Sequence, residues 1–168
     1  MSHHTCGIGV AVALLLAGPL LADTSGPAWS RHPWAGCRVG TWVRFNGVIK
    51  DANQTSHVVW TSTLLAATKE SYKIAYASDE GPGTTMVIEQ PAKEAKKPTT
   101  TTECGEETIL VGGKRYRCGV SISVIDTGQV VVTLKIWSCP TVPGGIVRAE
   151  GSAGQVTWSS ELDAFERK

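Results

Sequence analysis

The side chains that most often perform catalysis are sparse in this chain and form no recognised catalytic pattern. Apart from His3 and His4 near the start, the only histidines are His32 and His57. His57 lies among strand-forming residues, where a structural histidine is the simpler interpretation than a general base. The segment 119–123 (GVSIS) lacks the second glycine of a nucleophile elbow and lies inside a predicted strand. The histidines and serines therefore indicate no triad.

Six carboxylates fall in two groups that merit comparison with acid–base chemistry. They are Glu103, Glu106 and Glu107, and Glu161, Asp163 and Glu166. Glycoside hydrolysis needs two carboxyl groups held across a cleft, one with a raised pKa. The alternating acids of the second group are more typical of a solvated strand face that prevents edge pairing. We therefore predict that the protein is not an enzyme and that it uses no cofactor.

An apolar run at the start of the chain is typical of a signal peptide. Residues 7–22 (GIGVAVALLLAGPLLA) carry no charge and end on the small residue Ala22, before Asp23. The run is shorter than the roughly 20 apolar residues of a membrane span. We expect cleavage near Asp23 and a secreted or periplasmic protein that does not span the membrane.

Export changes the interpretation of the cysteines, because removing Cys6 leaves an even number in an oxidising compartment. No two of the four form a Cys-x-x-Cys knuckle, so we predict no metal site. Three disulfide connectivities remain open. If Thr127-Gly128 is a hairpin tip, Cys118 opposes Trp137 and lies one diagonal step from Cys139. We therefore predict Cys118–Cys139 and, by elimination, Cys37–Cys104.

Length and charge limit the classes of function. The chain has 168 residues, and 16 Lys plus Arg nearly balance 15 Asp plus Glu, for a net charge of +1. This length suits one packed domain. Near-neutrality without a basic cluster argues against nucleic-acid binding and polybasic membrane association. We divide the chain into a signal peptide (1–22), a Pro/Trp/Gly leader (23–39) with a short helical turn near Trp34 to Cys37, and one β domain (40–168).

From Gly40 onward, short runs of β-branched and aromatic residues alternate with turn residues, which predicts an all-β antiparallel meander of eight to nine strands. In the first run Val43, Phe45 and Ile49 share one face. We interpret Gly47 as a β-bulge and Gly112-Gly113 as a hairpin turn. The predicted strands are 41–50, 55–66, 71–77, 84–89, 108–111, 114–124, 130–138, 146–150 and 155–165.

Residues 91–105 begin with PAKEAKKPTTTT and contain almost nothing apolar. Lysines, prolines and threonines in this density are typical of a solvated loop. We expect this loop to connect two halves of one sheet.

Six tryptophans are the strongest ligand-binding signal. Trp42, Trp60, Trp137 and Trp158 fall in four different strands, and indoles serve both as core residues and as walls of apolar pockets. A meander of this size must curl into a half-barrel or open barrel, whose interior can hold an apolar ligand. These four tryptophans are our pocket candidates, and we expect Trp34 to close one end.

Several short segments resemble a group of uncharacterised secreted bacterial proteins. They are 32–36 (HPWAG), 39–43 (VGTWV), 111–118 (VGGKRYRC), 136–138 (IWS) and 142–147 (VPGGIV). Members resemble long-stranded antiparallel half-barrels, distantly similar in architecture to the periplasmic lipoprotein carriers LolA and LolB. The resemblance implies the fold but no functional residue, and Cys37, Cys104 and Cys139 depart from its pattern.

Two functions from different classes follow. The first is a non-catalytic exported protein that binds a lipid or another apolar or amphipathic ligand on the concave face of the half-barrel. The alternative is a structural or interaction protein of the cell envelope, which has an envelope protein as its partner and no small-molecule ligand.

Overall fold

Nine antiparallel strands form one continuous sheet in the computed structural model, which describes residues 33–79, 85–91, 100–126 and 128–168. The predicted signal peptide and most of the leader lie outside these residues. The strands are β1 (Trp42–Lys50), β2 (Thr55–Ala67), β3 (Ser71–Ser78), β4 (Thr85–Pro91), β5 (Thr100–Val111), β6 (Lys114–Asp126), β7 (Val131–Ser138), β8 (Ile146–Ala153) and β9 (Val156–Glu166). The described residues contain no helix long and apolar enough to cross a membrane. The predicted all-β antiparallel meander is confirmed.

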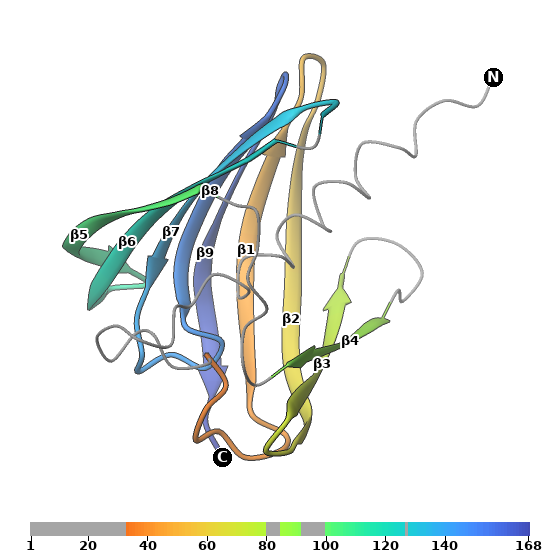
Figure 1. Ribbon diagram of the computed structural model, residues 1–168, viewed down its shortest axis with the longest axis vertical. Coiled ribbons are helices and arrows are strands. Elements are labelled where there is room, and N and C mark those ends of the chain that lie inside the picture. Colours follow the sequence, from red (N-terminus) through yellow and green to blue (C-terminus); the bar gives the residue numbers. More distant parts are fainter. Residues whose placement is uncertain (1–32, 80–84, 92–99, 127) are drawn as a thin grey trace.

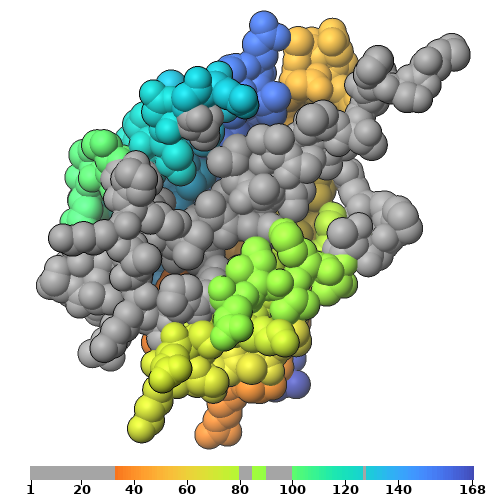
Figure 2. All heavy atoms as spheres, turned by 45° about the vertical axis from the view of Figure 1, so that its right-hand side comes forward, coloured from red at the N-terminus to blue at the C-terminus, as the bar shows by residue number. Residues whose placement is uncertain are grey.

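The first and last strands pair in the middle of the sheet. The strand order is β4-β3-β2-β1-β9-β8-β7-β6-β5, so β4 and β5 are its two borders and the sheet is not closed. Figure 1 shows the sheet curling around a concave side. In Figure 2, β4 (green) lies next to β3 (yellow-green) at one border. The fold is therefore an open, curled sheet.

Alternation along the strands separates a buried inner face from an outer face. We call inner the face that carries Val43, Phe45 and Ile49, all of which are buried as predicted. Register extends this face to Trp60 and Leu64 on β2, and to Ile74 and Tyr76 on β3. On the other side of β1 it continues through Trp158, Ser160 and Leu162 of β9. The core of the protein is thus built mainly on one face of a single sheet.

Two glycines of the inner face give room to tryptophans on neighbouring strands. Gly47 is paired regularly with both Val58 and Ser160, so its interpretation as a bulge is wrong; the irregularity in β1 lies between Arg44 and Phe45. A Cβ at Gly47 would lie 2.4 Å from the Trp60 ring, and one at Gly151 would lie 2.1 Å from the Trp158 ring. Glycine is required at both positions because an indole packs across the backbone.

Two further expectations need correction. β5 begins at Thr100, so residues 100–105 are strand and not loop; the threonines of this run are β-branched, which favours extended backbone. The last strand is not an edge, because β9 lies between β1 and β8. Its acids therefore face basic side chains on both neighbours and have no role in blocking an edge.

The hairpin of β6 and β7 has a different register from the predicted one. Asp126 pairs with Val131, and Val120 pairs with Trp137, so Cys118 does not oppose Trp137. The turn is longer than a two-residue tip, and the Gly128 amide donates to the Asp126 carboxylate at 2.8 Å. At the other end of β6, Gly112 and Gly113 have φ of 55° and 76°, which confirms the predicted glycine hairpin.

The close packing of Trp158 on Gly151 predicts a context-dependent mutation. Gly151→Ala should lower the free energy of unfolding by about 1–3 kcal/mol, because the new methyl group overlaps the indole. In a Trp158→Leu background the same change should be neutral or stabilising, since alanine restricts the unfolded backbone more than glycine does. Urea unfolding of the four proteins measures this coupling; an equal cost in both backgrounds would contradict the packing account.

Candidate functional site

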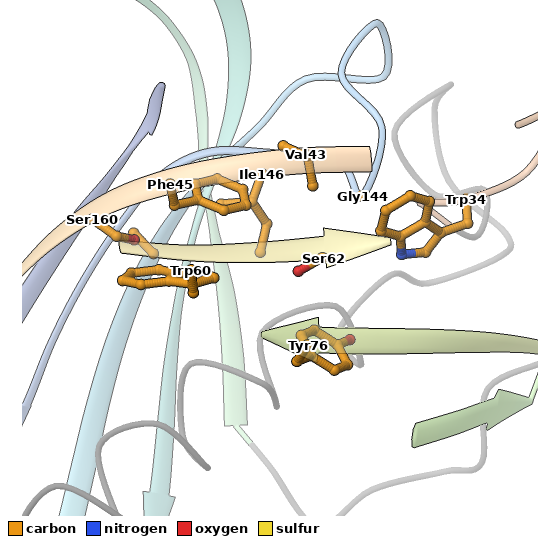
Figure 3. A pocket seen from close by; sticks show the side chains of 10 residues that line it. Trp34, Val43, Phe45, Trp60, Ser62, Tyr76, Gly144, Ile146 and Ser160 are labelled. Carbon is orange, nitrogen blue, oxygen red and sulfur yellow. The ribbon is translucent and has the colours of Figure 1, made fainter. Parts of the chain in front are cut away.

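A small cavity lies on the inner face where β1, β2, β3, β8 and β9 meet the segment before β1. Its volume is about 40 Å³, and it is lined by Trp34, Val43, Phe45, Trp60, Ser62, Tyr76, Gly144, Ile146, Ala149 and Ser160. Figure 3 shows lining side chains along β1, β2 and the neighbouring β3, with Trp34 next to Gly144 at one end. The described lining contains no charged side chain, so the site is suited to apolar contacts.

Trp34 closes one end of this cavity, as its position before the first strand predicted. It is 1% exposed. The Cys37 amide donates to the Trp34 carbonyl at 3.1 Å, which forms a turn where a short helical turn was expected. On the other side, Gly144 has φ of 74° and donates its amide to the Pro33 carbonyl at 3.2 Å. A Cβ at Gly144 would lie 3.3 Å from the indole, so glycine permits this close approach.

The loop that supports Trp34 is held together by backbone hydrogen bonds. The Cys139 amide donates to the Gly145 carbonyl at 2.7 Å. The Val142 amide donates to the Cys139 carbonyl at 3.2 Å, and the Gly145 amide donates to the Val142 carbonyl at 2.9 Å. Val142 is buried. We call residues 139–145 the capping loop.

Aromatic side chains from adjacent strands form the long wall of the cavity. The rings of Phe45 and Trp60 are stacked with centroids 5.7 Å apart and an interplanar angle of 24°. Their Cα atoms are direct cross-strand partners, the arrangement that brings side chains on one face closest together. Tyr76 reaches the same space from β3, opposite Ser62.

The polar groups of the lining are few and uncharged. Ser62 and Ser160 are both buried, at 5% and 3% exposure. They approach the cavity from β2 and β9, on either side of β1. Their hydroxyl groups give this uncharged lining polar side-chain atoms.

The four tryptophan pocket candidates lie in four different environments. Trp60 lines the cavity, and Trp158 is buried further along the inner face with Ile49, Val58 and Leu134. Trp42 lies on the outer face, where its Nε1 donates to Glu166 at 3.0 Å. The structure therefore brings only Trp60 to the cavity.

Trp137 belongs to a separate environment on the side of β7 opposite Ile136. Its Nε1 donates to Glu107 at 2.5 Å, and the Lys135 ammonium lies 4.3 Å from the ring centroid. The Arg148 guanidinium lies over the same ring at 5.6 Å. These cation–π contacts give Trp137 a structural role on the outer side.

Two cavity residues, Phe45 and Tyr76, were not among the predicted ligand-binding candidates. Phe45 and Tyr76 each occupy an inner position of a strand whose alternation is visible in the sequence. The two side chains come together through the cross-strand register of β1, β2 and β3. This register cannot be predicted from the sequence of any one strand.

The carboxylates of β9 form ion pairs across the outer face. Asp163 accepts from Arg44 Nε at 2.6 Å, and Glu161 pairs with Arg148. Among the β5 acids, Glu106 accepts from Arg117 Nε at 2.7 Å. Exposed pairs of this type contribute about 0–1 kcal/mol each to stability. In the part of the chain that the structure describes, no three His, Cys, Asp or Glu side chains gather as metal ligands.

The four predicted disulfide cysteines are free thiols in the structure. Cys118 and Cys139 are buried, Cys37 is half-buried and Cys104 is exposed on β5. Burial, together with repulsion from Cys139 and Glu107, raises the pKa of Cys118 to about 12. Burial also raises the pKa of Cys37, an effect that the neighbouring Arg167 opposes. The Cys37–Cys104 pairing stays a prediction.

Distant matches among solved structures include the following two proteins. A protein of the DUF1329 family from Desulfovibrio piger has a TM-score of 0.44 and 8% identity, over 89% of this chain and 93% of that one. The hypothetical lipoprotein YmcC of Escherichia coli has a TM-score of 0.34 and 10% identity, over 96% and 97% of the two chains. No family model and no curated protein matches the chain.

The two environments of Trp34 and Trp42 predict different mutational costs. Trp34→Ala should lower the free energy of unfolding by about 3–5 kcal/mol, because it empties a buried site against Gly144 and Val43. Trp42→Ala should cost about 1 kcal/mol, because the half-buried indole lies on the outer face. Denaturant unfolding of both variants checks this, and equal costs would contradict the assignment of Trp34 as a core residue.

Proposed function

We propose that the protein is an exported, non-catalytic binding protein for an apolar or amphipathic ligand, which it holds on the inner face of its half-barrel. The observation that carries this proposal is the uncharged cavity walled by Trp34, Phe45, Trp60 and Tyr76. Aromatic walls with a few neutral polar groups are the usual composition of sites for small apolar molecules.

The size of the cavity indicates how a ligand enters. At about 40 Å³ it holds a few water molecules, whereas sites for drug-sized ligands occupy roughly 300–1,000 Å³. An acyl chain therefore has to displace side chains of the inner face. We expect Trp60 to change its position on binding. It is only half-buried, and it packs across Gly47, which has no side chain that would block the movement of the indole.

Export is part of this proposal. The uncharged apolar segment 7–22 supports it, as does the even number of cysteines after that segment. The near-neutral charge is consistent with recognition through an apolar interior and not through a charged surface.

Native mass spectrometry with oleate tests the binding proposal. The unmodified protein should show saturable addition of oleate, and Ser160→Phe should abolish it because the new ring fills the cavity. Ser159→Phe is the matched control. Ser159 is the neighbour of Ser160 on β9 and is exposed on the opposite face, so oleate binding should persist. If Ser160→Phe does not fold, Ser62→Val, which adds less volume in the same cavity, should weaken binding instead.

The outcome that would contradict the proposal is the bare polypeptide mass for the unmodified protein at every oleate concentration. This result would favour the structural or interaction protein of the cell envelope. The observation that favours this second candidate is the pair of sheet borders: residues 100–108 of β5 are exposed and pair only with β6 among the described strands. An open strand edge is a common docking site for a partner strand.

A further inference from the structure

Two buried cysteines, Cys118 and Cys139, lie just beyond the last pair of the β6–β7 ladder. The last pair of this ladder joins Gly119 to Ser138. Continuing the antiparallel register by one position places Cys118 opposite Cys139. Directly opposed residues of such a ladder have Cα atoms about 4.5–5.5 Å apart. This separation falls within the range that a disulfide requires, which is about 4.4–6.8 Å.

The two side chains also point to the same side of the sheet. Cys118 shares its face with Val120, and Cys139 shares its face with Trp137, because each pair is separated by two positions on one strand. Val120 and Trp137 are themselves cross-strand partners. Both cysteines are buried, at 0% and 5% exposure, in one apolar cluster.

Cys139 is also the first residue of the capping loop that supports Trp34. Its amide is bonded to Gly145, next to the glycine that contacts the indole. A covalent bond at Cys139 would therefore anchor the capping loop to β6. Without it, the loop is held by β7, β8, its own backbone hydrogen bonds and the bond from the Gly144 amide to the Pro33 carbonyl.

We propose that Cys118 and Cys139 form a disulfide that fixes the capping loop to β6, and that the free thiols of the structure represent its reduced form. In the oxidation each thiol loses its proton, one S–S bond forms, and the two electrons pass to an external disulfide such as glutathione disulfide, which leaves as two thiols. The first thiolate forms a mixed disulfide and releases one glutathione; the second attacks it and releases the other. Because both sulfurs are buried, the bond forms during folding. The proposal does not depend on ligand binding.

A disulfide map of refolded protein tests the proposal. Reduced, unfolded protein is refolded in a buffer of reduced and oxidised glutathione, alkylated and digested with trypsin without reduction. Trypsin cleaves after Arg117 and Lys135, so Cys118 and Cys139 fall in separate peptides. These two peptides should be found joined. Cys118 alkylated in the native protein, or joined to Cys37 or Cys104, would overturn the proposal.

Two variants test the Cys118–Cys139 disulfide itself, and a hydrogen-exchange measurement tests its effect on the capping loop. Cys104→Ser, at an exposed position, should leave the Cys118–Cys139 bond intact, whereas Cys139→Ser should leave Cys118 alkylated. Hydrogen exchange of the capping-loop amides should be several-fold slower in the oxidised protein than after reduction. Equal exchange rates in the two forms would overturn the assigned anchoring role.

Discussion

The pairing of β1 with β9 is the constraint on which the rest of the structure depends. It joins strands from the two ends of the meander along nine residue pairs and divides the sheet into a β1–β4 half and a β5–β9 half. Because the chain ends pair in the centre, β4 and β5 become the borders and the sheet stays open. The same pairing places Phe45 next to Leu162 and Gly47 next to Ser160. The cavity of the inner face lies where these two halves meet.

Tryptophan side chains that pack across glycines form a large part of this single-sheet core. Trp60 and Trp158 each lie across a glycine of an adjacent strand, at Gly47 and Gly151, so their rings approach the backbone more closely than any side chain would permit. Trp34 uses Gly144 in the same way from outside the sheet. Three of the six tryptophans therefore depend on particular glycines. Among the described residues, a small cavity remains beside Phe45 and Trp60.

Sequence patterning predicted the strands well because alternation and turn residues are local signals. The all-β meander of eight to nine strands, the Gly112-Gly113 hairpin and the inner positions of β1 follow from it, whereas the first eight residues of β5 do not. Patterning did not predict that β9 pairs with β1, since strand order depends on contacts between the chain ends. For the same reason it assigned the acids of β9 to an edge. It also selected Trp42 and Trp137 for a pocket, because residue type does not reveal which face of a curled sheet closes around a cavity.

The proposed ligand should bind to the inner face of the sheet and not to the outer one. The indole Nε1 signals of the six tryptophans, followed by NMR during titration with spin-labelled stearate, test it most directly. We expect strong broadening of the Trp60 and Trp34 signals, which belong to the cavity lining, and little change for Trp42 on the outer face. Equal broadening of Trp42 and Trp60, or no broadening of any indole signal, would contradict it.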